Sequence, residues 1–314
     1  PISGEELAHS CSVSRTAIWK AIRSLEDDGY KIEAVTNLGY RLVDVPESLD
    51  QSEILTCLGD HPWHDTVHVL DTVDSTNSLA KREAMQGAPD GSVYLSDEQT
   101  GGRGRQGREF LSPKGKGLYL SVLLRPACSP AELSHVTAMA AVAVCNAVEQ
   151  TCGVRPGIKW TNDLILGEKK CVGILSELGA EWESGTLEYL VIGIGVNCGQ
   201  GTEDFPEELR HKATSILLET GQRVDRNRLA AALIQELGSL SAGILTEKQR
   251  YLRQYARDCL TIGRPVRIIR SHGVRDAFAT GIDENGALLV RYDNGETGVV
   301  FSGEVSVRGR DGYL

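Results

Sequence analysis

Residues 101–108 read Gly101-Gly102-Arg103-Gly104-Arg105-Gln106-Gly107-Arg108, with four glycines and three arginines in eight positions. Glycine has no Cβ atom, so a segment this rich in it disfavours one continuous helix or strand. Each guanidinium group offers a planar fork of N–H donors that matches carboxylate and phosphate oxygens. The stretch predicts a mobile loop that closes over an anionic ligand. Alone, it fits a solvated surface loop or an RGG-like nucleic-acid segment equally well, because short glycine motifs often occur by chance.

The composition is that of a globular protein of two or three domains. The chain has 314 residues, of which 41% are hydrophobic and 24% charged. No apolar run is long enough to span a bilayer and no secretory signal is visible, so we expect no membrane partner. The eight cysteines are scattered without a CxxC pair, which favours a reduced, cytoplasmic protein. The net charge of -10 argues against non-specific nucleic-acid binding but permits a local basic patch.

The first 45 residues predict a small separate unit. Ser3 followed by Glu6 is a capping box for a short helix, and Ser14 caps a second helix that ends near Gly29. Alternating residues from Tyr30 to Val43, around Asn37-Leu38-Gly39, predict a hairpin. A helix, a turn, a helix and a hairpin in this order indicate a winged helix-turn-helix.

The second helix is basic. Residues 14–25 contain Arg15, Lys20 and Arg23 and no acidic residue. In a negatively charged protein, such a helix favours specific docking on DNA. A protein–protein module with solvated basic residues remains the alternative. The chain begins at Pro1 without Met, which leaves open that this unit lacks its first helix.

The rest of the chain predicts two further regions. Residues 46–64 suggest a linker, with a short helix around 49–56 as the alternative. Residues 65–260 mix strands and helices without a regular βαβ repeat, which indicates an α+β arrangement rather than a Rossmann domain; the last helical stretch, from Arg226, is expected to break near Gly238 and Gly243. After residue 261, short strands with Asn-Gly pairs at 285–286 and 294–295 predict type I′ hairpin turns and a small β-barrel.

Four polar segments could converge on one site. They are Asp74-Ser75-Thr76-Asn77, Gln99, Lys159-Trp160-Thr161-Asn162-Asp163 and Gly193-Ile194-Gly195-Val196-Asn197. Each alone has a structural interpretation as a helix cap, a surface residue, a core tryptophan beside a turn, or a bulge. No Ser/His/Asp order or His/Cys cluster suggests hydrolysis or a structural metal.

Together these segments resemble a known family, the bifunctional biotin–protein ligases that also act as biotin operon repressors. The matching stretches are Asp74–Asn77, Gly102–Arg108, Lys159–Asp163 and Gly173-Ile174-Leu175-Ser176-Glu177, in the same order and at similar spacing. Residues 14–20 and the hairpin ending in Gly39-Tyr40 resemble the family's DNA-binding domain, so the likeness covers nearly the whole chain. We expect an α+β protein whose parts are a winged helix-turn-helix (1–45), a linker (46–64), a mixed α/β ligase domain (65–260) and an SH3-like β-barrel (261–314).

The resemblance implies a two-step reaction. Biotin and ATP, with Mg²⁺, give biotinyl-5′-adenylate and pyrophosphate, and the biotin then passes to a lysine of the biotin carboxyl carrier protein. The adenylate-bound homodimer would repress biotin genes at operator DNA. The residues fit this chemistry, because Arg103, Arg105 and Lys159 can offset the repulsion between biotin's carboxylate and the α-phosphate.

The family also implies roles for individual residues. Lys159 and Arg105 would be catalytic, and Asp163 would hold the metal. Biotin would be bound by Ser75, Thr76, Asn77, Gln99, Arg103, Gly104, Arg105, Lys159, Gly193 and Gly195. ATP and the adenylate would be bound by Arg105, Arg108, Phe110, Lys159, Asn162 and Asn197. DNA would be bound by Ser14, Arg15, Thr16, Trp19 and Lys20.

Two other functions fit part of the sequence. A biotin-sensing repressor without enzymatic activity would need the N-terminal unit but no ATP. A lipoate or octanoate ligase would share the core, but its substrate has no ureido ring for Ser75 and Gln99 to bind.

Overall fold

The computed structural model describes residues 1–27, 30–35, 38–44, 48–180, 186–270, 273–301 and 306–309. The chain divides into two compact units, residues 1–48 and 49–314. The expected helix end at Gly29, the hairpin residue Asn37 and Pro46 of the expected linker lie outside the described residues.

The smaller unit contains the two predicted helices and the predicted hairpin. Its elements are α1 (Gly4–Ser10), α2 (Arg15–Asp27), β1 (Lys31–Val35) and β2 (Gly39–Asp44), with β1 and β2 antiparallel. The Ser3 side chain accepts a hydrogen bond from the Glu6 amide at 3.1 Å, which confirms the first helix cap. Ala8, Ile18 and Ile22 form the small core between the helices. Because these apolar residues face inward, the basic residues of α2 remain on its exposed face.

The expected linker turns out to be partly helical and packed. Asp50 caps the N-terminus of helix α3 (Gln51–Leu58). Within this helix, the Ile54 side chain is fully buried in the core of the larger unit. The Asn227 amide donates to Glu53 Oε2 at 2.6 Å, which ties α3 to a helix far along the chain. The short helix expected around residues 49–56 as the alternative to a linker is therefore confirmed, and its apolar face is covered.

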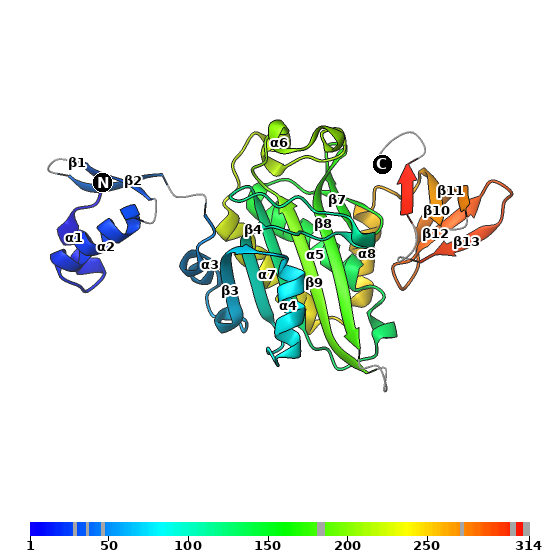
Figure 1. Ribbon diagram of the computed structural model, residues 1–314, viewed down its shortest axis with the longest axis horizontal. Helices are drawn as coiled ribbons and strands as arrows, with labels where there is room; N and C mark the ends of the chain where they lie inside the picture. Colours follow the sequence, from blue (N-terminus) through cyan, green and yellow to red (C-terminus); the bar gives the residue numbers. More distant parts are fainter. Residues whose placement is uncertain are drawn as a thin grey trace. The chain divides into compact units, whose positions relative to one another are not determined.

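A mixed sheet forms the centre of the larger unit (Figure 1). Across residues 48–180 and 186–270, seven strands pair in the order β3-β4-β5-β9-β8-β7-β6. Only the β3–β4 pair in this series is parallel, so the expected absence of a regular βαβ repeat is confirmed. The bounds are β3 Val67–Val73, β4 Ser92–Gln99, β5 Gly117–Leu124, β6 Gly157–Lys159, β7 Asp163–Leu166, β8 Lys169–Ala180 and β9 Leu187–Asn197.

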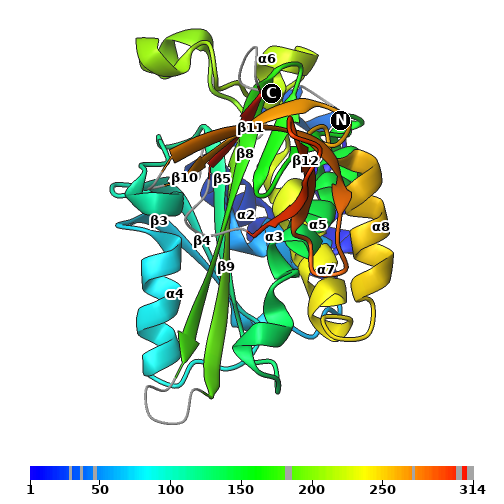
Figure 2. The same ribbon diagram turned by 90° about the vertical axis from the view of Figure 1, so that its right-hand side faces the viewer.

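Helices cover both faces of this sheet. Helix α4 (Thr76–Met85) lies on one face, and α5 (Val136–Cys152), α7 (Arg226–Ala242) and α8 (Lys248–Asp258) lie on the other (Figure 2). A short helix, α6 (Ile216–Thr220), follows β9. In the described part of the chain, Pro130–Cys152 is the one helical segment apolar and long enough to cross a membrane, and its most apolar window is 72% buried. Its burial is that of a core helix.

The predicted helix break at Gly238 is wrong. Helix α7 runs unbroken through this position, and a Cβ atom there would collide with the His61 ring. Glycine is needed for this close approach, not for a turn. The break near Gly243 is confirmed, because α7 ends at Ala242 and α8 starts at Lys248.

A small antiparallel sheet ends the chain. In residues 265–270, 273–301 and 306–309, five strands pair in the order β13-β12-β11-β10-β14. They are β10 (Pro265–Arg270), β11 (Gly273–Ile282), β12 (Leu288–Tyr292), β13 (Thr297–Val300) and β14 (Ser306–Gly309). The type I′ prediction is wrong at both turns, because only Gly286 and Gly295 have positive φ and the preceding asparagines do not.

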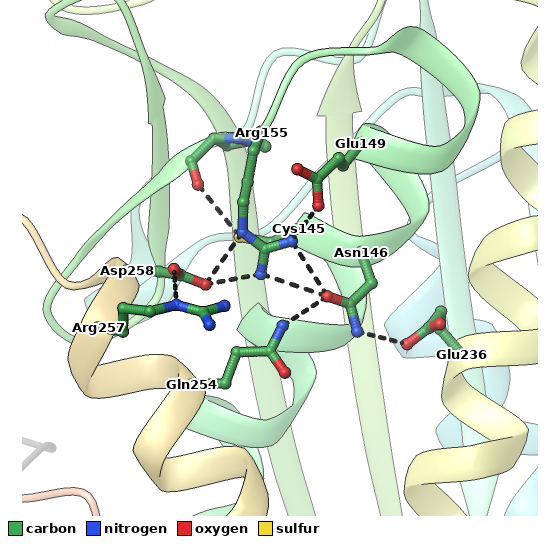
Figure 3. A network of polar contacts seen from close by, with 9 residues as sticks. Cys145, Asn146, Glu149, Arg155, Glu236, Gln254, Arg257 and Asp258 are labelled. Carbon is green, nitrogen blue, oxygen red and sulfur yellow. Dashed lines mark hydrogen bonds and ion pairs between the residues drawn. The ribbon is translucent and has the colours of Figure 1, made fainter.

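One polar network fastens three helices of the larger unit together (Figure 3). Arg155 Nη2 donates to Asp258 Oδ2 on α8 at 2.6 Å, and Nη1 donates to Glu149 Oε2 on α5 at 2.5 Å. Asn146 Nδ2 donates to Glu236 Oε2 on α7 at 2.9 Å, while its Oδ1 accepts from both Arg155 and Gln254. Because Asp258 is nearly buried, this network should contribute more stability than an exposed ion pair.

We expect Asp258→Asn to lower the free energy of unfolding by about 1–3 kcal/mol, since it leaves the Arg155 guanidinium without its main acceptor. Urea denaturation of the full chain measures the change. Arg257→Gln is the matched control, because this exposed arginine also contacts Asp258 and should change stability by about 0.5 kcal/mol or less. Equal losses in the two variants would contradict the role given to the buried pair.

Candidate active site

The end of β4 and the start of α4 form a polar floor. Ser75 caps α4, and Gln99 Oε1 accepts hydrogen bonds from the Thr76 amide at 2.9 Å and the Thr76 hydroxyl at 3.1 Å. Gln99 Nε2 donates to Ser112 Oγ at 2.8 Å. Strand β3 ends beside β4, because the two pair in parallel as far as Val73 and Gln99, and this places the segment that follows β3 next to Gln99. Two segments that are more than twenty residues apart in the chain are thereby brought together.

Glycines allow side chains to cross β9 closely. A Cβ atom at Gly193 would overlap Asn77 Oδ1, and one at Gly195 would overlap the Phe110 ring. Gly173 on the neighbouring β8 also faces that ring, with 3.1 Å between its would-be Cβ and Phe110 Cε2. The Gly193-Ile194-Gly195 pattern therefore serves close packing at the cavity.

The glycine–arginine loop folds back on itself in the structure. Arg103 and Glu109 form an isolated bridge, and the Gly104 amide donates to the Arg108 carbonyl at 2.7 Å. Between them is a single 3-10 turn, Arg105–Gly107, in which Gln106 has φ 58°. The absence of a long helix or strand here agrees with the glycine content. That the loop closes on a ligand stays a prediction.

The loop is joined to the β6–β7 segment. Arg105 Nη1 donates to Asn162 Oδ1 at 3.0 Å, and Asn162 Nδ2 donates to the Ile174 carbonyl on β8 at 2.9 Å. Burial lowers the pKa of Arg105, an effect that the negative charge of Asp163 opposes. A guanidinium group held partly out of water interacts strongly with an incoming anion.

The cavity that these parts line is partly open, and the empty space within it and at its mouth is about 440 Å³. Predicted residues on its wall are Ser75, Thr76, Asn77, Gln99, Arg103, Gly104, Arg105, Phe110, Asn162, Gly193 and Gly195. The remaining wall residues, which the sequence did not single out, are Lys170, Gly173, Ile174, Leu175 and Ile194. Four of these lie in stretches quoted above for other reasons, but nothing in the sequence patterns singled out Lys170, which lies on β8.

Four of the residues predicted to bind biotin, the nucleotide or the metal are not on this wall, namely Lys159, Asp163, Asn197 and Arg108. Lys159 is buried on β6, where it pairs with Asp163 of β7 in the strand register. Asn197 is buried, and its amide group is used within the protein by the Thr214 carbonyl and Gln200 Nε2. Arg108 is exposed on the loop.

Lys170 adds a cation that sequence reasoning missed. Its Nζ lies 2.6 Å from Asp163 Oδ1 and 5.8 Å from the centre of the Phe110 ring. The backbone of Lys170 is held on both sides, because its amide donates to Lys212 and its carbonyl accepts from Thr214, each at 2.8 Å. With Arg103 and Arg105, it gives the cavity three cationic side chains.

Two buried thiols are unsuited to covalent catalysis, and no metal cluster is preformed in the part of the chain that the structure describes. Burial raises the pKa of the Cys145 and Cys198 thiols to about 12, so neither is a thiolate near neutral pH. Among the described residues, no group of three or more His, Cys, Asp or Glu side chains is arranged to hold a metal ion. A polar floor with cations above it suits an anionic ligand that also carries hydrogen-bonding groups.

Three segments of the chain match protein families. Residues 69–197 match the biotin/lipoate A/B protein ligase family, residues 1–41 an HTH domain, and residues 261–308 the biotin protein ligase C terminal domain.

Individual relatives match over most of their length. The bifunctional ligase/repressor BirA of Bacillus spizizenii is 36% identical over 306 residues, covering 94% of this chain and 90% of that protein. The protein of the same name from Escherichia coli is 32% identical, covering 98% and 92%. A solved structure, the biotin protein ligase from Aquifex aeolicus in complex with biotin and ATP, is similar with a TM-score of 0.66 and 28% identity, over 78% of this chain and 99% of that one.

Proposed function

The chain belongs to the biotin/lipoate A/B protein ligase family, among its bifunctional ligase/repressors, and from this we propose that it is an ATP-dependent biotin ligase that also represses transcription. It joins biotin and ATP into biotinyl-5′-adenylate with release of pyrophosphate, and transfers the biotin to a lysine of the biotin carboxyl carrier protein. The observation that carries the proposal is one cavity with a hydrogen-bonding floor of Ser75, Thr76 and Gln99 and with arginines on its rim.

The two ends of the cavity suit the two ends of biotin. A ureido ring offers two N–H donors and a carbonyl acceptor, which hydroxyl and amide groups on the floor can pair. The carboxylate would then point toward Arg103 and Arg105, where the α-phosphate of ATP must also come. Cations fixed there lower the repulsion between the two anions and stabilise charge that develops during attack. Positioning supplies much of the remaining rate, so no enzyme nucleophile is required.

The nucleotide would lie over Phe110, with Arg108, Asn162 and Asn197 in the roles predicted for them and Lys159 as a catalytic cation. Mg²⁺ is the metal expected with ATP. Asp163, its predicted ligand, is ion-paired with Lys170, which fits a cation held mainly by phosphate oxygens with few protein ligands. Its charge would offset that of the triphosphate.

The remaining proposals concern organisation. We propose a winged helix-turn-helix in residues 1–45, a ligase domain in 65–260 and an SH3-like barrel in 261–314. The adenylate-loaded protein would dimerise on operator DNA in the cytoplasm, since a two-fold operator presents two half-sites. The exposed N-terminal part of α2, with Trp19 52% exposed, supports a role in DNA contact.

Transfer of labelled biotin to a purified carrier domain tests the enzymatic part. We expect transfer that requires both ATP and Mg²⁺. Biotin binding without transfer would favour the non-enzymatic sensor, and transfer of lipoate in preference to biotin would favour a lipoate ligase.

Arg15→Ala and Lys20→Ala test the repressor part. Each should weaken operator binding about equally across related sequences and reduce the slope of log affinity against log salt by about 1, since each removes one phosphate contact. Fluorescence anisotropy measures this on a duplex selected from random DNA with the adenylate-loaded full chain. Arg228→Ala, an exposed arginine of the larger unit, is the control. Unchanged affinity in both α2 variants would overturn the assignment of α2 to DNA.

A further inference from the structure

A chain of polar groups runs from the outside of α4 to the floor of the cavity. Lys81 Nζ donates to Glu177 Oε1 at 2.6 Å, and Asn77 Nδ2 donates to Glu177 Oε2 at 2.8 Å. Neither Lys81 nor Glu177 is on the cavity wall, whereas Asn77 is. In the chain as far as the structure describes it, Asn77 is the cavity-wall side chain that hydrogen-bonds to this ion pair.

The orientation of the Asn77 amide follows from its neighbours. Its Nδ2 faces a carboxylate oxygen of Glu177 and the Leu175 carbonyl at 3.2 Å, and both of these only accept hydrogen bonds. Its Oδ1 therefore faces Ser121 Oγ at 2.6 Å, and the hydroxyl of Ser121 must donate to it. If the Asn77 amide were flipped, its Oδ1 would face two other acceptor oxygens, those of Glu177 and Leu175.

The Gln99 amide is fixed by the same kind of argument. The Thr76 amide, which can only donate, faces Gln99 Oε1, and Ser112 gives its own hydrogen to the Phe110 carbonyl at 2.9 Å. Gln99 Nε2 therefore donates to Ser112, and Oε1 is an acceptor beside the Thr76 hydroxyl.

Between these fixed amides, three contacts share two hydroxyl hydrogens. The contacts are Ser121–Asn77 at 2.6 Å, Ser121–Thr76 at 2.8 Å and Thr76–Gln99 at 3.1 Å. Ser121 gives its hydrogen to Asn77, so Thr76 has one hydrogen for two acceptors. The cavity floor is therefore one hydrogen short, and a ligand N–H placed against Thr76 and Gln99 would supply it.

We propose that Glu177 and Lys81 are positioning residues that set the cavity floor to accept N–H donors, and so select the cyclic urea of biotin over rings with an oxygen in place of N–H. This rests on the proposed biotin-ligase function. The pair acts through Asn77, because the Glu177 carboxylate accepts a hydrogen bond from Asn77 Nδ2 and the Lys81 ammonium group fixes the position of that carboxylate.

Glu177→Gln should invert this pattern while keeping the shape. The Lys81 ammonium group contacts one carboxylate oxygen of Glu177 at 2.6 Å. We expect it to hold the single side-chain oxygen of the glutamine in the same way, so that the glutamine NH₂ group faces Asn77. Asn77 then turns over and donates to Ser121. One oxygen–oxygen contact remains, between Asn77 Oδ1 and the Leu175 carbonyl, but the Ser121 hydrogen is freed for Thr76 and the Thr76 hydrogen for Gln99. Each of the three contacts, Asn77–Ser121, Ser121–Thr76 and Thr76–Gln99, then has its own hydrogen. The ligand N–H therefore loses the acceptor that Thr76 and Gln99 offered.

Removing the lysine as well should restore the original pattern. In the Lys81→Met, Glu177→Gln double variant, the glutamine oxygen is free to face Asn77 Nδ2, and its NH₂ group can turn to solvent because this position is partly exposed. The second substitution, which removes the lysine charge, should thus restore the preference for biotin over the carbamates. If the ion pair had a purely structural role, the second substitution would not restore it.

Calorimetry on the full chain measures affinities for biotin and for the two cyclic carbamates in which one ureido N–H is replaced by oxygen. We expect wild type to bind biotin about 100-fold more tightly than at least one of the carbamates. In Glu177→Gln this preference should fall below about tenfold, and in the double variant it should return to within about threefold of the wild-type preference. Glu188→Gln, an exposed glutamate on β9, is the matched control and should behave as wild type.

Failure of this inference is distinct from failure of the proposed function. If Glu177→Gln keeps the full preference, or if it loses affinity for biotin and carbamates equally and the double variant does not recover, the positioning role is overturned. If wild type binds neither biotin nor the carbamates, the ligase assignment itself fails.

Discussion

We expect Arg105→Ala to lower the rate of biotinyl-adenylate formation by about 100- to 1,000-fold, the range seen when one preorganised donor is removed from a site of developing charge. Arg105 is the loop cation that already contacts the opposite wall of the cavity, through Asn162 Oδ1 at 3.0 Å. Because burial has removed part of its hydration, the proposed interaction of Arg105 with the carboxylate and the α-phosphate would be weakly screened. Pyrophosphate release from biotin and ATP, measured before any turnover of the carrier, reports this step.

The same variant also tests closure of the loop. If residues 101–108 fold over the ligand, the Arg105→Ala protein should release preformed adenylate faster than wild type in a chase with unlabelled ligand. Arg105→Lys separates charge from geometry, because it keeps the cation but loses the planar fork. Arg228→Ala serves as the control for loss of a surface arginine. If the Arg105→Ala protein formed and released the adenylate at wild-type rates, the role proposed for this loop would be wrong.

Gly193→Ala should weaken biotin binding by about 100-fold. The added methyl group would occupy the position of Asn77 Oδ1. Asn77 has no free space to retreat into, because it is 4% exposed and bonded to Ser121, Glu177 and Leu175. Displacing it breaks a buried hydrogen-bond network at the cavity floor, and each unpaired buried group costs about 1–3 kcal/mol.

Equilibrium binding of biotin measures this effect, with thermal unfolding alongside it. Gly199→Ala is the matched control, since its new methyl group would come no nearer than 3.7 Å to another atom, the Lys116 carbonyl oxygen. We expect Gly199→Ala to bind biotin as wild type does. If Gly193→Ala also bound biotin normally, the close crossing of α4 over β9 would not matter to the site.

Local sequence patterns were sufficient for most elements. Capping residues and alternation predicted the two helices and the hairpin of the first unit, because each side chain's environment there repeats with the element's own period. Where the prediction failed, a distant residue decided. Gly238 stays inside α7 because the His61 ring packs against it. The sequence left a linker and a helix open for residues 51–58, and the core of the larger unit decides for the helix by covering its apolar face.

The sequence by itself determined the chemistry of this protein: guanidinium groups on a glycine-rich loop, hydroxyl and amide groups at a helix start, and a basic helix in an acidic chain. Those properties belong to residue types and short spacings, which are visible in one dimension. Only the tertiary structure decided which groups meet. The cation Lys170 is on the cavity wall while Lys159 is not, and the proton pattern of the floor depends on Glu177, one hundred residues from Asn77. Hydrogen bonds act over about 3 Å, so they are set by how strands and helices are brought together in space and not by distance along the chain.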